Sequence, residues 1–284
     1  MARRLASLCV VVAASVVAGA CGGGDSAREV VAEAPEKTVE KRSSRFAVEA
    51  VTRSGEAVTT LVGEGVFDFA AQRGRLALDL TGVGLLGRKA DMLILGDVFY
   101  LNFPIEIPEA HGRPWLKLDI DDATFLSDIN LGALSQLANY DPTGAVQFLR
   151  GVPDDVQKAG EEDVRGTGTE HYKARLDIDA LSGRVPQQAQ DDVARIRDVV
   201  GVRFVPTEAW VDEDGRLRRV RQSLDLSNVR SRAPTGQPFR GTQVITFELF
   251  DFGVNVDVAE PPADEVALLS DVARALVQRP PGMA

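Results

Sequence analysis

Segments in which apolar and polar residues alternate with a period of two recur through the body of this 284-residue chain. Residues 75–80 place Leu76 and Leu78 on one face, and residues 170–179 place Leu176 on the apolar side of a similar segment. This period is typical of a strand with one buried face, whereas an amphipathic helix repeats every 3.6 residues. The chain must therefore fold around a sheet whose apolar face needs a cover.

We expect about ten strands in antiparallel order. They cover residues 45–53, 57–69, 75–80, 92–95, 98–103, 115–119, 170–179, 204–212, 216–226 and 243–252. The turn sequence at residues 212–215 predicts a hairpin between the eighth and ninth of these strands. Helices are expected at residues 131–137, 142–149, 187–200 and 264–277. The predicted fold class is α+β, with one large curved antiparallel sheet and helices covering its concave face.

The apolar residues of the best-patterned strands fall on one face, which we predict to be the floor of a cavity. Its candidate lining residues are Phe67, Phe69, Leu76, Leu78, Tyr172, Leu176, Ile178, Leu224, Leu226, Ile245, Phe247 and Leu249. A single sheet with so wide an apolar face needs helices to cover it. The glycine-rich stretch 82–87 and the proline-rich stretch 104–114 are candidates for movable rims.

The first twenty residues are typical of a secretory signal peptide. Arg3 and Arg4 precede an uncharged run over residues 5–20, which is shorter than the roughly 20 residues of a spanning helix. The run ends in Val-Ala-Gly-Ala20-Cys21, which resembles the lipobox of bacterial lipoproteins, although Ala18 stands where that motif usually has Leu. The resemblance implies cleavage between Ala20 and Cys21 and acyl chains, such as palmitate, on Cys21.

The cysteine count agrees with a lipid anchor. Cys9 lies inside the leader, so the mature chain keeps Cys21 alone and forms no internal disulfide. Two or more acyl chains would hold the protein stably on a membrane. Residues 22–44 are rich in Gly, then in Glu, Lys, Ala and Ser, and predict a flexible tether. We expect three parts: a signal peptide at 1–20, the lipidated Cys and tether at 21–44, and one folded domain at 45–279.

Composition excludes several functions. The formal net charge is −10, and loss of the two leader arginines makes it −12, so nucleic acid is not an expected partner. The chain has two His and no Gly-x-Ser-x-Gly elbow, and Cys21 is committed to lipid, which argues against catalysis and zinc. The GxGxxG pattern at 82–87 lacks the following helix of a dinucleotide site. We expect no enzyme, metal or cofactor.

Several short motifs together resemble a known family. They are Val98-Phe99-Tyr100-Leu101, Pro114-Trp115-Leu116-Lys117-Leu118-Asp119, Glu161-Glu162-Asp163-Val164-Arg165-Gly166 and Trp210-Val211-Asp212 with Asp214-Gly215-Arg216. In this order they resemble the LppX/LprG-type lipoproteins of actinobacteria, which share the half-open barrel of the LolA and LolB carriers. The resemblance implies a hydrophobic cavity between sheet and helices that takes lipid acyl chains, and it implies no catalytic residues.

Two functions remain open from the sequence. The first is a cell-envelope lipoprotein, anchored on the extracytoplasmic face of the membrane, that binds an apolar lipid or glycolipid and transports or presents it. An envelope transport protein would then be a candidate partner. The second is a structural or signalling surface lipoprotein that recognises a partner protein and has no lipid cavity. A lipid that co-purifies in stoichiometric amount would favour the first.

Overall fold

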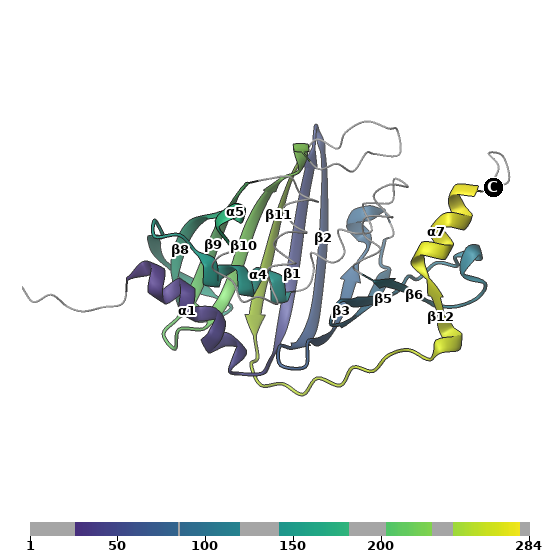
Figure 1. The fold of residues 1–284 in the computed structure, drawn as a ribbon, viewed down its shortest axis with the longest axis horizontal. Helices are drawn as coiled ribbons and strands as arrows, with labels where there is room; N and C mark the ends of the chain where they lie inside the picture. The colour runs from purple at the N-terminus through teal and green to yellow at the C-terminus, as the bar shows by residue number, and fades with distance from the viewer. Residues whose placement is uncertain (1–25, 85, 120–141, 182–202, 229–240, 279–284) are drawn as a thin grey trace, which may run out of the picture.

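The computed structural model describes residues 26–84, 86–119, 142–181, 203–228 and 241–278. These residues form one twelve-stranded sheet with short helices packed against it (Figure 1). The sheet is open, with β12 at one edge and β7 at the other. This arrangement confirms the predicted α+β class and the single large antiparallel sheet. Among the described residues, no helix has the length and apolar character needed to cross a membrane.

Two meanders meet at the centre of the sheet. The first contains β1 (Ser43–Ser54), β2 (Ala57–Asp68), β3 (Arg73–Asp79), β4 (Lys89–Leu95), β5 (Val98–Asn102) and β6 (Trp115–Asp119). The second contains β7 (Gln157–Val164), β8 (Thr167–Asp177), β9 (Phe204–Asp212), β10 (Leu217–Asp225) and β11 (Thr242–Phe250). All these neighbours are antiparallel, and β11 pairs with β1, so the two meanders form two wings of one sheet.

The helices are short and lie at defined places on the sheet. They are α1 (Ala27–Val39), α4 (Pro142–Phe148), α5 (Ile178–Leu181) and α7 (Leu269–Gln278), with 3-10 turns η1 (Thr81–Val83), η2 (Pro108–Ala110), η5 (Leu149–Gly151), η6 (Leu226–Asn228) and η7 (Ala263–Glu265). Helix α1 contacts β9 and β10, and α4 contacts β10. Helix α7 packs instead on β6 and η2 at the other wing. The helices expected at 131–137 and 187–200 lie outside the described residues.

The expected flexible tether is wrong for residues 27–44, because Ala27–Val39 form α1, residues 40–42 turn the chain, and β1 begins at Ser43. Ser26 and Glu29 make a capping box: the Ser26 hydroxyl accepts from the Glu29 amide, and the Ser26 amide donates to the Glu29 carboxylate. Val31 and Ala34 are buried, 1% and 0% exposed. The helix is therefore stabilised by packing on the sheet rather than by its own composition.

Two further strands were not expected. Strand β7 has seven exposed residues out of eight, so it lacks the alternation that identifies a half-buried strand. Strand β12 (Val266–Leu268) is only three residues long and pairs in parallel with β6. The helix expected at 264–277 accordingly begins later, at Leu269, as α7.

An extended segment between β11 and β12, residues 251–265, runs along one end of the sheet from its centre to the far wing (Figure 1). The Ser43 hydroxyl donates to the Val254 carbonyl oxygen at 2.5 Å. Further along, the Tyr100 hydroxyl donates to the Glu260 carboxylate. We call residues 251–265 the strap, because these bonds tie it to β1 and β5.

Candidate functional site

The predicted cavity residues share one face of the sheet and are almost completely buried. Eleven of the twelve are between 0% and 7% exposed, and Leu224 is half-buried. Nine lie within strands, whereas Phe69, Ile178 and Leu226 stand just beyond the ends of β2, β8 and β10. The register places the nine strand residues on one face, Leu224 among them. That this face lines a cavity stays a prediction.

The strand register joins this face into a continuous apolar row across eight strands. Its members are Tyr172, Ala209, Val220, Phe247, Val48, Gly63, Leu78 and Ala90, each paired with the next. All eight are buried. With about 4.8 Å between neighbouring strands, the row measures roughly 34 Å along the sheet. We call it the apolar row.

Two buried polar atoms interrupt the apolar face. Gln243, 4% exposed, donates its amide nitrogen to the Thr52 hydroxyl at 3.2 Å, but its side-chain oxygen has no hydrogen-bond partner in the described part of the chain. The Ser44 hydroxyl, fully buried, likewise has none there. An unsatisfied buried acceptor or donor costs about 1–3 kcal/mol, so each is a position where a ligand hydroxyl would be stabilising.

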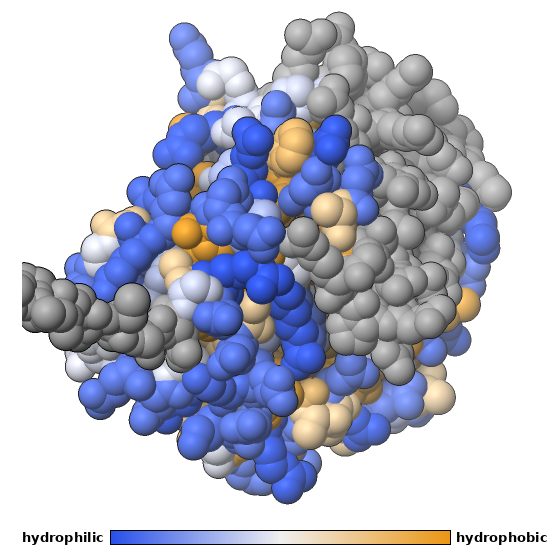
Figure 2. Space-filling model, turned by 60° about the vertical axis from the view of Figure 1, so that its left-hand side comes forward, coloured by the Kyte–Doolittle hydropathy of each residue, from blue (hydrophilic) through white to orange (hydrophobic). Residues whose placement is uncertain are grey.

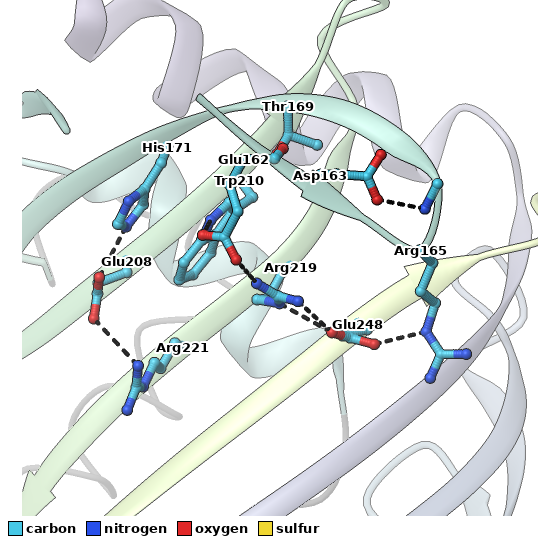
Figure 3. A network of polar contacts seen from close by, with 11 residues as sticks. Glu162, Asp163, Arg165, Thr169, His171, Glu208, Trp210, Arg219, Arg221 and Glu248 are labelled. Carbon is cyan, nitrogen blue, oxygen red and sulfur yellow. Dashed lines mark hydrogen bonds and ion pairs between the residues drawn. The ribbon is translucent and has the colours of Figure 1, made fainter. Parts of the chain in front are cut away.

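The opposite face carries a polar network that the sequence did not predict (Figure 3). Trp210 stacks on His171, with ring centroids 4.2 Å apart and planes 4° from parallel. The Arg219 guanidinium lies 5.0 Å from the Trp210 ring, a cation–π distance. The Trp210 indole nitrogen donates to Glu162 at 2.8 Å. These residues come from four neighbouring strands, β7 to β10.

Charge pairs extend this network to the centre of the sheet. Arg219 donates to Glu248 at 2.8 Å and to Glu162 at 2.8 Å, and Arg165 donates to Glu248 at 2.6 Å (Figure 3). Arg165 occupies the turn between β7 and β8 with a φ of +52°, and its side chain reaches Glu248 on β11. We call Glu162, Arg165, Trp210, Arg219 and Glu248 the hairpin clamp.

The electrostatics of the hairpin clamp favour two fixed anions. The hydrogen bond from Trp210, with that from Arg219, holds the pKa of Glu162 below its ordinary value. Burial alone would raise the pKa of Glu248, but the bonds from Arg219 and Arg165 outweigh it and lower that pKa. Both carboxylates stay ionised near neutral pH. They are therefore suited to fastening the β7–β8 hairpin rather than to exchanging protons.

Three hollows are lined by described residues, and most of their lining residues lie on the polar face or beside α1. Two shallow ones, of about 430 and 410 Å³, share Glu49, Thr246 and Glu248 on the polar face. A third, of about 680 Å³, lies between α1 and the ends of β7–β9. It is lined mainly by carboxylates, among them Glu161 and Asp163, and we call it the acidic groove. The described residues contain no group of three or more His, Cys, Asp or Glu placed to hold a metal ion.

Other predicted site residues are only partly placed. Ala20 and Cys21 lie outside the described residues, so cleavage and lipidation stay predictions. The glycine-rich stretch 82–87 connects β3 to β4, and the proline-rich stretch 104–114 connects β5 to β6, which agrees with their expected role as strand connections. Whether they move as rims stays a prediction. The hairpin clamp was missed because alternation within one strand does not give the register between β7, β9, β10 and β11.

Comparisons with known proteins give a consistent set of similarities. No protein-family model matches the chain. An uncharacterised 31.2 kDa protein of Streptomyces griseus is 23% identical over 158 residues, covering 54% of this chain and 48% of that protein. A putative lipoprotein of Streptomyces coelicolor is 29% identical over 178 residues, covering 61% and 49%. The chain thus spans about half the length of each of these relatives.

The similar solved structures include three named proteins. The lipoprotein LppX of Mycobacterium tuberculosis is 12% identical with a TM-score of 0.46, covering 81% of this chain and 99% of that one. LprF of Mycobacterium bovis is 10% identical with a TM-score of 0.40, covering 83% and 96%. A LolA-superfamily protein of Nitrosomonas europaea is 10% identical with a TM-score of 0.30, covering 80% and 93%. LppX and a LolA-superfamily member are thus among the similar structures, as the sequence motifs indicated.

Proposed function

We propose that this protein is a cell-envelope lipoprotein that binds an apolar lipid or glycolipid against the apolar face of its sheet and transports or presents it. The observation that carries the proposal is the apolar row, which runs without a charged residue across eight strands. A folded core needs apolar residues on that face, but a row of this length is also long enough to hold a whole extended acyl chain. The proposal needs no catalytic residue, metal or cofactor.

The free energy of such binding would come from the apolar surface of the acyl chain that leaves water. Each acyl CH₂ transferred from water to protein contributes about 0.8 kcal/mol. A bilayer core of about 30 Å holds two opposed acyl layers, so one acyl chain is roughly half as long as the 34 Å row. An acyl chain lying along the row would therefore keep its whole length in apolar contact. The Gln243 side-chain oxygen, which has no hydrogen-bond partner among the described residues, would suit a hydroxyl on the polar part of the ligand.

The same face also gives the main support for a second candidate. Eleven of its twelve predicted lining residues are already 0–7% exposed, so a lipid must displace part of the cover before it can bind. A solidly packed sheet is what a structural or signalling lipoprotein would have, with partner recognition on another surface. In the lipid-binding proposal, the rims at 82–87 and 104–114 would open and admit the ligand.

Membrane attachment through Cys21 is part of the proposal. It is supported by the lipobox-like residues before Cys21 and by the similarity to the putative lipoprotein of Streptomyces coelicolor. Attachment would place the folded body on the extracytoplasmic face of the membrane. Metabolic labelling with a fatty acid tests this directly: the wild type should be labelled and retained with membranes, and Cys21→Ala should be neither. Equal membrane retention of both without label would exclude the anchor.

Lipid binding is tested by extracting the purified protein and identifying co-purifying lipid by mass spectrometry. Leu176→Arg and Leu226→Arg place a charge in the predicted floor, and Val62→Arg is the matched control because Val62 is 42% exposed on the opposite face. Folded floor variants that lose a lipid retained by the control would support the proposal. Floor variants that all unfold, together with a lipid-free wild type, would favour the solidly packed alternative, since an unpaired buried charge is costly.

A further inference from the structure

The described fold begins very close to the proposed anchor. Ser26, the N-cap of α1, is five residues beyond Cys21. A fully extended chain spans at most about 3.6 Å per residue, so the Cα atoms of Cys21 and Ser26 can be no more than about 18 Å apart. The acyl chains on Cys21 would lie in the bilayer, and α1 must therefore begin near the headgroups.

Helix α1 is fixed on the sheet, so its position orients the whole body. Val31 and Ala34 are buried against the core, and the Thr38 hydroxyl accepts from the Leu217 amide at 2.9 Å. Near the N-terminus of the helix, Arg28 pairs with Asp154 at 2.9 Å. These contacts leave no free linker between α1 and the rest of the protein. The four residues between Cys21 and Ser26 are thus the whole separation between anchor and body.

The N-terminal half of α1 lies at one wing of the sheet. The helix contacts η5, β7, β9 and β10, and Val30 lines the acidic groove with residues of β7 to β9. Figure 1 shows α1 at the same side of the molecule as β8, while β6, β12 and α7 lie at the opposite side. The sheet order separates β9 from β6 by eight strand spacings, roughly 38 Å along the curved sheet.

We infer that the protein stands on the membrane by its β7–β9 wing, with the β6 and α7 wing directed away from the bilayer. This orientation rests on the proposed lipidation of Cys21. It follows from the length of chain before α1 and from the packing of α1, and it identifies the surface that faces the lipid headgroups.

The chemistry of that wing indicates how it meets the membrane. The view that brings it forward is mostly hydrophilic with scattered apolar residues (Figure 2). The acidic groove adds Glu161, Asp163 and Glu213 to this side, and the mature chain carries a formal charge of −12. Such a surface neither inserts into hydrocarbon nor adheres to anionic lipid. The lipid anchor therefore holds the β7–β9 wing against the headgroup layer, which is the surface that this wing faces.

The two tryptophans of the chain report on this orientation, because Trp210 is on β9 and Trp115 is on β6. A chain beginning at Cys21 keeps the complete described fold and has one cysteine. That thiol is coupled to a maleimide lipid in zwitterionic vesicles containing a dansyl-labelled headgroup lipid. Energy transfer to dansyl falls steeply with distance. We expect several-fold more efficient transfer from Trp210 alone, in Trp115→Phe, than from Trp115 alone, in Trp210→Phe.

Two controls keep the test decisive. If Trp210→Phe does not fold, the comparison of wild type with Trp115→Phe suffices, because removing the distant tryptophan should raise the mean efficiency. Thirty flexible Gly/Ser residues inserted after Gly24 would lengthen the linker to roughly 30–35 Å, and the difference between the two tryptophans should then shrink. Equal transfer from both tryptophans with the native linker, or stronger transfer from Trp115, would overturn the orientation. Because the coupling is chemical, this result does not depend on lipidation in cells, which the labelling of Cys21 tests separately.

Discussion

Replacement of Thr38 by Val should destabilise the whole domain, although Thr38 lies in a segment whose composition suggests a tether. The Thr38 hydroxyl is fully buried, donates to the Ala34 carbonyl at 2.6 Å and accepts from the Leu217 amide at 2.9 Å. Valine keeps the shape but leaves the buried Leu217 N–H without its acceptor. Such an orphaned group costs about 1–3 kcal/mol of the free energy of unfolding.

Thermal unfolding followed by circular dichroism measures this loss. For a domain of this size about 2–4 °C of melting temperature corresponds to each kcal/mol, so a fall of about 2–12 °C is expected. Thr59→Val is the matched control, since Thr59 is half-buried on β2 and its side chain makes no hydrogen bond with other described residues. It should change stability by less than about 0.5 kcal/mol. If Thr38→Val matched this control, α1 would not be docked in solution, and the orientation inferred for the membrane-bound protein would fail with it.

Three further predictions concern titration and the ligand. Burial, together with the hydrogen bond to Glu260, raises the pKa of Tyr100 to about 12. The protonated Tyr100 hydroxyl should therefore contribute its full stabilisation of the fold below about pH 10 and lose it between about pH 10 and 12. Ultraviolet titration of Tyr100→Phe should lack the transition near pH 12. Glu248 has a lowered pKa, so its contribution is present above about pH 4.5 and lost as pH falls through the lower folded value. Stability of Glu248→Gln should therefore depend less on pH in this acidic range, and an unchanged acid profile would exclude the role given to the hairpin clamp. Gln243→Leu removes the unpaired amide oxygen; it should leave the protein folded but weaken retention of a hydroxyl-bearing lipid relative to a purely apolar one, as lipid mass spectrometry would show.

Local patterns predicted the well-buried strands accurately. The hairpin through residues 212–215 appears as β9 and β10 with almost the expected bounds, because one face of each strand meets the core and the turn residues are specific. The same parity placed the cavity residues on one face. Alternation of apolar and polar residues arises where one face of a strand is buried, so it predicts the strands that pack against the core.

What the patterns missed has physical causes. Edge strand β7 is exposed on both faces, so selection for burial leaves no period in its sequence. Helix α1 contains Pro35 and many charged residues, and only the Ser26–Glu29 capping box marked its start. The hairpin clamp depends on register between strands far apart in sequence, and alternation within one strand carries no information about its partner.

The pairing of β1 with β11 has a consequence for how the chain folds. Val48 lies beside Phe247, a partner about 200 residues later in the chain. The first long strand can form a local hairpin with β2, but its other edge stays open until the last quarter of the chain is present. Contacts this distant in sequence make folding slow, because a large loop must close before they form. A chain emerging from its N-terminal end therefore cannot complete its core until β11 has been made.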